Sequence, residues 1–128
     1  MATYKEINKQ GSKNNRIINC LLQFHIAEET SKFGFSLEEV KSIIAQNKLQ
    51  GLTNVCIKGV MGMATFTDNK NQIETEFQKL ASYYKEIKES MEKETFEVIS
   101  MGMSGDYKIA VDNGSNMVRI GSTIFGPR

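Results

Sequence analysis

Residues 96–121 read FEVISMGMSGDYKIAVDNGSNMVRIG, and this stretch decides the fold class. Its apolar run from Phe96 to Met101 predicts a strand, and the segment from about Gly105 to Asn113 predicts a short helix. Gly114 suits the C-terminal cap of that helix, because glycine accepts the left-handed backbone that such caps often use. A second apolar run, Met117 to Ile120, predicts the next strand. A strand, a helix and a strand in this order are typical of a parallel βαβ unit.

The residues before this stretch repeat the alternation. Apolar runs from Arg16 to Ile26 and from Val55 to Met63 predict two further strands, and the first has the composition of a strand buried on both faces. A polar, helix-compatible segment covers about residues 4–14. The sequence therefore predicts an α/β fold in which four parallel strands alternate with helices.

Two longer helices are predicted between the strands. Ser36 and Glu39 have the spacing of a capping box, so one helix should start there and end near residues 47–49. The other should start at Thr67, Asp68 or Asn69 and carry one apolar stripe at helical spacing. That stripe consists of Ile73, Phe77, Leu80, Tyr84, Ile87 and Met91. Its spacing predicts a helix packed on the sheet, and a coiled-coil partner surface is the alternative.

The composition of the 128 residues narrows the function classes. Sixteen basic residues oppose fifteen acidic ones, and a net charge of +1 gives no field that would attract nucleic acid or an anionic membrane. No apolar run approaches the roughly 20 residues that span a bilayer. The polar N-terminus lacks the apolar core of a secretory signal, so we expect a cytoplasmic protein.

Few side chains are available for metal or thiol chemistry. Cys20 and Cys56 lie in apolar runs and are expected to be buried free thiols, with a disulfide or a nucleophilic thiolate as the alternatives. Together with a single histidine, His25, they are too few for a four-ligand metal site. His25 ends the first strand, where a structural role is favoured over a catalytic one. No catalytic residue and no metal ligand is assigned.

The candidate site lies where the strands end, because parallel sheets bind ligands at the carboxyl ends of their strands. After the last two strands, glycine stands beside a hydroxyl residue, in Ser104-Gly105 and Gly121-Ser122. Small residues leave backbone N–H groups accessible, and a helix N-terminus is partly positive, so these turns predict a phosphate site. Arg119 adds a fixed positive charge. Plain tight turns between strand and helix are the alternative.

Three more features near the strand ends have an ordinary structural interpretation. Gly62 in MGMA (61–64) and Gly102 in MGMS (101–104) either admit a ligand or only allow close packing. The flanking Met63 and Met103 either line the site or belong to the core. Asp106, in the first turn of its helix, is expected to complement the helix dipole.

The sequence resembles the YggS/PROSC family of pyridoxal 5′-phosphate (PLP) homeostasis proteins. The resemblance is carried by SMGMSGD at 100–106 and GSNMVRIGSTIFG at 114–126. It extends through MGMATF at 61–66, LQFHIAEE at 22–29 and KFG at 32–34. It covers essentially the whole chain. The family fold is a (β/α)8 barrel similar to the N-terminal domain of alanine racemase. The resemblance implies that residues 1–128 form one partial domain, the C-terminal half of such a TIM barrel, with strands equivalent to 5–8.

The resemblance also implies a PLP site. Ser104 matches a serine that contacts the phosphate, and Gly121 and Ser122 match positions whose backbone N–H groups hold it. Arg119 matches the arginine near the pyridine nitrogen, where a cation disfavours protonation of that nitrogen. The family's N-terminal half, with the lysine that forms the Schiff base with PLP, has no counterpart here, so any PLP should be held non-covalently.

These implications favour a non-enzymatic PLP-binding protein. Lys32 lies in the loop after the first strand and Lys58 inside a strand, and neither matches the family's lysine. Half of a PLP-dependent, racemase-like enzyme is the alternative, although no catalytic tyrosine motif is recognisable, and an unrelated phosphate-metabolite or interaction module is the third. Because four strands leave two open edges, we expect self-association, pairing with a separate N-terminal half, or poor solubility.

Overall fold

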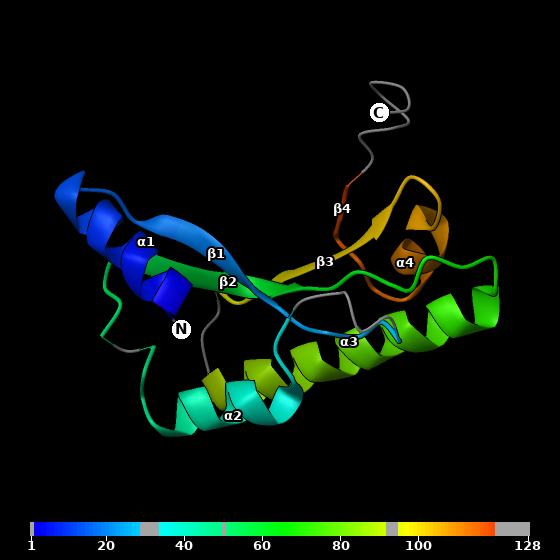
Figure 1. The fold of residues 1–128 in the computed structure, drawn as a ribbon, viewed down its shortest axis with the longest axis horizontal. Helices are drawn as coiled ribbons and strands as arrows, with labels where there is room; N and C mark the ends of the chain where they lie inside the picture. The colour runs from blue at the N-terminus through cyan, green and yellow to red at the C-terminus, as the bar shows by residue number, and fades with distance from the viewer. Residues whose placement is uncertain (1, 29–33, 50, 92–94, 120–128) are drawn as a thin grey trace.

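The structure is a computed structural model that describes residues 2–28, 34–49, 51–91 and 95–119. Strands and helices alternate along it as the sequence predicts (Figure 1). In chain order they are α1 (Ala2–Lys13), β1 (Ile18–Gln23), α2 (Leu37–Ala45), β2 (Val55–Met61), α3 (Lys70–Met91), β3 (Val98–Met103), α4 (Tyr107–Asp112) and β4 (Met117–Arg119). The four strands pair in parallel in the order β1-β2-β3-β4, which confirms the predicted α/β class.

Local sequence signals fix the starts of the two longer helices that follow β1 and β2. The Ser36 hydroxyl accepts a hydrogen bond from the Glu39 N–H at 3.2 Å, and the Glu39 carboxylate accepts one from the Ser36 N–H at 3.0 Å. This is the predicted capping box of α2. At the start of α3, the Asn69 side-chain oxygen accepts from the Gln72 N–H at 3.2 Å, which selects Asn69 among the three candidate caps. Helix α2 ends at Ala45, earlier than predicted.

The core lies between the sheet and the helices that cover it. In Figure 1, α2 and α3 run side by side below the sheet, and Lys41 of α2 pairs with Glu86 of α3 at 3.2 Å on the surface. Four members of the predicted stripe of α3 are buried, and Tyr84 and Met91 are half-buried. The largest fully buried side chains are Phe24, Phe77, Phe96, Leu22, Leu80, Ile87, Met101, Val40 and Val60.

Two burial predictions are wrong, one for strand β1 and one for the cysteines. Strand β1 is not buried on both faces: Asn19 is exposed, and among its six residues only Leu22 is fully buried. Cys20 and Cys56 are free thiols as predicted, but both are half-buried rather than buried. Strand β1 forms an edge of the described sheet, so it lacks the second neighbouring strand that a central strand has.

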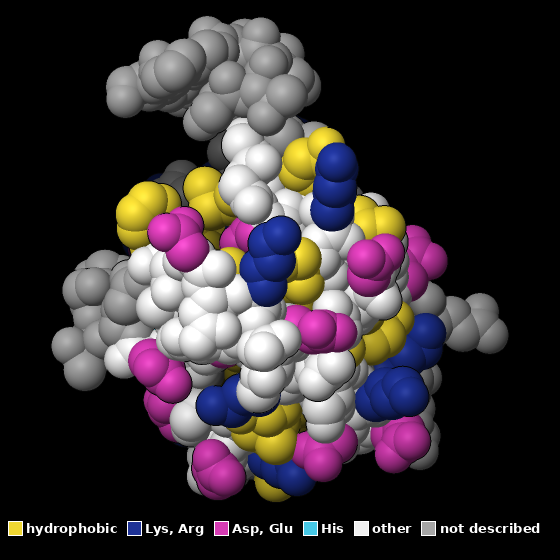
Figure 2. Space-filling view, turned by 90° about the vertical axis from the view of Figure 1, so that its right-hand side faces the viewer, with side chains coloured by type: hydrophobic (Ala, Val, Ile, Leu, Met, Phe, Trp, Pro, Cys, Tyr) yellow, Lys and Arg dark blue, Asp and Glu magenta, His cyan; other side chains and the backbone are white. Residues whose placement is uncertain are grey.

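The described surface carries both signs of charge. Figure 2 shows the α4 end of the molecule, where basic and acidic side chains alternate around hydrophobic patches. None of the helices in the described ranges combines the length and the apolar character that a membrane crossing requires.

Candidate ligand-binding site

The carboxyl ends of β2, β3 and β4 border a pocket of about 540 Å³, which we call the strand-end pocket. The loop after β2, from Met63 to Asp68, forms one side of it. The end of β3 and the turn that follows, Gly102 to Asp106, form another. Ile73 of α3 and Arg119 of β4 complete the described lining. The pocket therefore lies at the edge of the sheet where the sequence places the site.

Two of the four predicted site residues meet in this pocket. Ser104, after β3, and Arg119, on β4, both line it although they are 15 residues apart in the chain. Gly121 and Ser122 lie outside the described residues. His25 belongs to neither this lining nor that of the pocket beside β1 described below.

Arg119 is held in place by the strands beside it. Its guanidinium donates to the Ser100 hydroxyl at 2.6 Å and to the Gly62 carbonyl at 3.3 Å, so it bridges β3 and the end of β2. Burial lowers the pKa of Arg119, and the neighbouring Asp106 carboxylate opposes this effect. Because an arginine pKa lies so far above neutral pH, the side chain stays charged. The pocket thus contains a preoriented cation.

The turn after β3 is closed by Asp106. Its carboxylate accepts from the Met103 N–H at 2.7 Å, and its own N–H donates to the Met103 carbonyl at 3.1 Å. Asp106 stands at the N-cap position of α4 but makes no side-chain cap bond to that helix. Asp106 therefore stands just before the first turn of α4 rather than in that turn, where the sequence predicted it, and its carboxylate fixes the turn that carries Ser104.

The two glycines at the strand ends are packing positions. A side chain at Gly102, where φ is +104°, would place its Cβ 2.7 Å from the Ala110 Cβ. A Cβ at Gly62 would lie 2.8 Å from the Ile26 Cδ1. Both distances are shorter than ordinary van der Waals contacts, which supports close packing at both glycines, and Gly102 also lines the strand-end pocket. Met63 and Met103, which follow these glycines, line the strand-end pocket.

Sequence reasoning missed a hydrogen-bonded carboxylate behind the pocket. Glu76 of α3 is only 5% exposed, and its two oxygens accept from the backbone N–H and the hydroxyl of Thr65 at 2.6 and 2.7 Å. Thr65 lines the pocket, whereas Glu76 does not. The sequence does contain a sign that Glu76 is buried. Glu76 stands beside Phe77 and three residues after Ile73, and this spacing places it on the buried side of α3.

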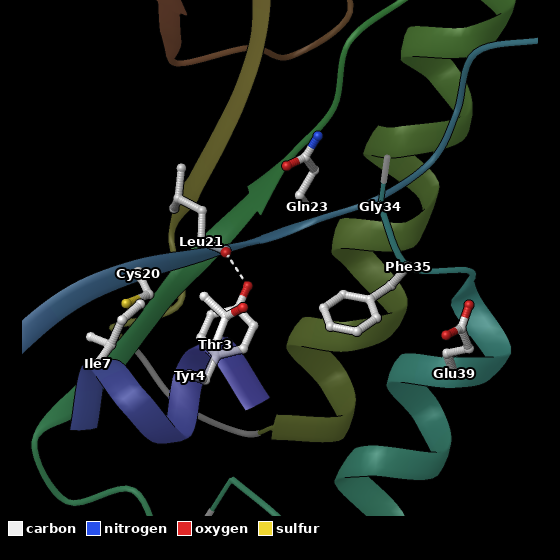
Figure 3. A pocket seen from close by; sticks show the side chains of 9 residues that line it. All are labelled: Thr3, Tyr4, Ile7, Cys20, Leu21, Gln23, Gly34, Phe35 and Glu39. Atoms are coloured by element: carbon white, nitrogen blue, oxygen red, sulfur yellow. Dashed lines mark hydrogen bonds between the residues drawn. The ribbon is translucent and has the colours of Figure 1, made fainter. Parts of the chain in front are cut away.

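A second pocket, of about 580 Å³, lies beside the edge strand β1, between α1 and α2 (Figure 3). There the Tyr4 hydroxyl donates to the Leu21 carbonyl at 2.6 Å, and the rings of Tyr4 and Phe35 stack with centroids 6.3 Å apart. Its described lining contains the Glu39 carboxylate and no lysine or arginine. It is therefore less suited to a phosphate than the strand-end pocket.

The thiol in this second pocket is not activated. Burial raises the pKa of Cys20, and the nearby Cys56 raises it further, so the thiol form persists at neutral pH. This argues against the nucleophilic alternative for Cys20. Across the ranges that the structure describes, no group of three or more histidine, cysteine or acidic side chains is placed to hold a metal ion.

Comparison with known proteins gives one consistent match. Residues 1–128 match the family described as "Alanine racemase, N-terminal domain". A protein of Haemophilus influenzae named "Pyridoxal phosphate homeostasis protein" is 34% identical over 122 residues, which are 95% of this chain and 51% of that protein. A protein of Vibrio alginolyticus with the same name is 35% identical over 127 residues, which are 97% of this chain and 52% of that protein. These matches confirm the resemblance found in the sequence.

Solved structures show the same fold. PipY of Synechococcus elongatus, solved without PLP, has a TM-score of 0.88 at 23% identity, and the match covers 98% of this chain and 57% of PipY. PipY solved with PLP bound has a TM-score of 0.85 at 22% identity. The chain spans about half the length of the curated relatives that it matches. Its strands and helices therefore correspond to one part of a longer α/β chain.

Proposed function

The chain belongs to the alanine racemase N-terminal domain family, and from this membership we propose that its strand-end pocket binds PLP. The observation that carries the proposal is the meeting of Ser104 and Arg119, from two different strand ends, in one pocket. The names of the relatives indicate the ligand, since they are pyridoxal phosphate homeostasis proteins, and PipY has been solved with PLP bound.

The chemistry of the pocket fits the two ends of this ligand. PLP carries an anionic phosphate at one end of a flat aromatic ring. The hydroxyl of Ser104 and the turn around it offer polar groups for the phosphate, while Met63, Met103 and Ile73 offer apolar surface for the ring. Arg119 supplies a positive charge in the same space. Bound PLP would contribute its pyridine ring, which can accept electron density from an attached substrate.

We assign a role to each predicted site residue. Ser104, together with the backbone N–H groups of Gly121 and Ser122, holds the phosphate. Arg119, which is fixed by its bonds to Ser100 and Gly62, would face the ring nitrogen of bound PLP. A fixed cation at that position disfavours protonation of the nitrogen and weakens the ring as an electron acceptor.

This arrangement favours binding over catalysis. The described lining of the strand-end pocket contains no lysine, histidine, cysteine or tyrosine. It does contain two carboxylates, Asp68 and Asp106, and that of Asp106 already accepts a hydrogen bond from the Met103 N–H. We propose that the chain contributes a non-covalent PLP site to a homeostasis protein. The second candidate, half of a racemase-like enzyme, is favoured by the description of the family itself.

A PLP titration with a matched arginine control tests the proposal. Absorbance and fluorescence titrations of the 128-residue chain should show saturable binding, and Arg119→Ala should weaken it about tenfold or more, since bonds to a charged group contribute about 1.5–3 kcal/mol. Arg16→Ala, which removes an exposed arginine before β1, should bind like the wild type. Borohydride reduction at stoichiometric PLP, followed by intact mass and peptide mapping, should show no adduct at one specific lysine. Equal affinities for wild type and Arg119→Ala would remove Arg119 from the site.

A further inference from the structure

The least expected group in the structure is the buried carboxylate of Glu76. Burial of a charged carboxylate is costly unless hydrogen bonds compensate for the lost water. We propose that Glu76 is a positioning residue for the strand-end pocket and acts through Thr65. This inference rests on the proposed function, because the pocket that Glu76 positions is the proposed PLP site.

Thr65 joins three segments of the chain. Its N–H and its hydroxyl donate to the two oxygens of Glu76 on α3, at 2.6 and 2.7 Å. Its hydroxyl oxygen also accepts from the N–H of Glu28, in the segment after β1, at 2.9 Å. Both donors of Thr65 are therefore directed at one carboxylate. The loop after β2 is tied to α3 on one side and to the segment after β1 on the other.

The hydrogen bonds of Thr65 affect the strand-end pocket because Thr65 lies in the middle of a loop that lines this pocket. The loop from Met63 to Asp68 leaves the sheet at the end of β2 and has neither helical nor strand hydrogen bonding of its own. Its next residue, Phe66, is 95% exposed, so packing in the core does not fix that part of the loop. The bonds at Thr65 therefore help to hold this side of the pocket in place relative to Ser104 and Arg119.

Substitutions at Glu76, Thr65 and Gln72 provide matched variants for testing the hydrogen bonds of Thr65. Glu76→Gln keeps the shape but leaves one acceptor oxygen, and its amide N–H groups oppose one of the donors of Thr65. Thr65→Val removes the hydroxyl, whereas Thr65→Ser keeps both donors. Gln72→Ala is the control, because it removes another donor to the same Glu76 carboxylate, at 3.2 Å, and leaves both bonds from Thr65 in place.

Two measurements on the 128-residue chain test the inference. In PLP titrations, Glu76→Gln and Thr65→Val should each raise the Kd about tenfold, which corresponds to about 1.4 kcal/mol, and the double variant should be no weaker than the poorer single one. Thr65→Ser and Gln72→Ala should stay within about twofold of wild type. In amide hydrogen exchange without ligand, Glu76→Gln should accelerate exchange at residues 64–67 and leave β3 unchanged.

The outcomes separate positioning from plain stability. If Glu76→Gln lowers the melting temperature but leaves the Kd unchanged, the carboxylate is only structural and the inference is overturned. A loss of affinity in Gln72→Ala as large as that in Glu76→Gln also overturns it. If the wild type binds no PLP, the proposed function fails, and the exchange measurement alone decides the matter: faster exchange at residues 64–67 supports the positioning role, and unchanged exchange overturns it.

Discussion

Substitution of Gly102 by alanine should lower the free energy of unfolding for two reasons, backbone strain and steric crowding. Gly102 has φ of +104°, a conformation that costs an L-residue about 1–2 kcal/mol. Its new Cβ would stand 2.7 Å from the Ala110 Cβ and 3.2 Å from the Tyr107 Cα, and crowding of this kind costs about 1–3 kcal/mol. Together the terms predict a loss of about 2–5 kcal/mol, a large part of the about 5–15 kcal/mol that stabilises a typical domain.

Alanine substitutions at Gly114 and Gly105 distinguish the cost of backbone strain from the cost of steric crowding. Gly114 also has a positive φ, +102°, but a Cβ there meets nothing within 4 Å, so Gly114→Ala should cost only the backbone term of about 1–2 kcal/mol. Gly105 lies in the turn after β3, is exposed, and also has open space around its Cβ position. Gly105→Ala should therefore change stability by less than about 0.5 kcal/mol.

Urea unfolding followed by far-UV circular dichroism measures these differences from the midpoint and the slope of each transition. The expected order of stability is wild type and Gly105→Ala, then Gly114→Ala, then Gly102→Ala. If Gly102→Ala is as stable as Gly114→Ala, the contact with Ala110 imposes no cost and the packing argument is refuted. If it matches Gly105→Ala, the backbone argument is refuted as well.

Three further predictions concern pH, capping and association. Burial raises the pKa of Tyr4 and of Cys20, so the unfolded chain loses these protons first; the free energy of unfolding should therefore fall as pH rises above about 9, and a flat profile of urea midpoints between pH 7 and 10.5 would contradict this. Ser36→Ala should cost about 1 kcal/mol in the same urea assay because it breaks the capping box of α2, and an unchanged midpoint would argue against that contribution. Strands β1 and β4 each lack a second neighbouring strand among the described residues, so we expect self-association in sedimentation velocity, whereas a stable monodisperse monomer would rule it out.

Periodicity and capping signals predicted the order of the elements. The stripe of α3 and the capping box of α2 are local, because each depends on residues three or four positions apart, and both are confirmed. The ends of the strands were less predictable. Strand β2 stops at Met61 rather than Met63, and β3 continues to Met103 rather than Met101. Pairing with a neighbouring strand decides where a strand ends, and that neighbour is distant in sequence.

The candidate site was predicted in outline only. The convergence of Ser104 and Arg119 follows from the rule that parallel strands end at one edge, so the sequence sufficed for it. The bond between Thr65 and Glu76 crosses from a loop to a helix 11 residues later, and the hydrophobic pattern gives no sign of it. Such a pattern reports which side chains are buried. It does not report which polar groups meet after burial.

The strand-end pocket has a further consequence for the order of folding. All of its described lining lies between Met63 and Arg119, on consecutive elements from the end of β2 to β4. The contacts across the pocket are nonetheless long-range in sequence, because the Arg119 guanidinium bonds to the Gly62 carbonyl 57 residues earlier. Contacts of this kind form late in folding. The pocket should therefore close only after α3 and β3 are in place, and the bond between Thr65 and the Glu28 N–H also requires the segment after β1.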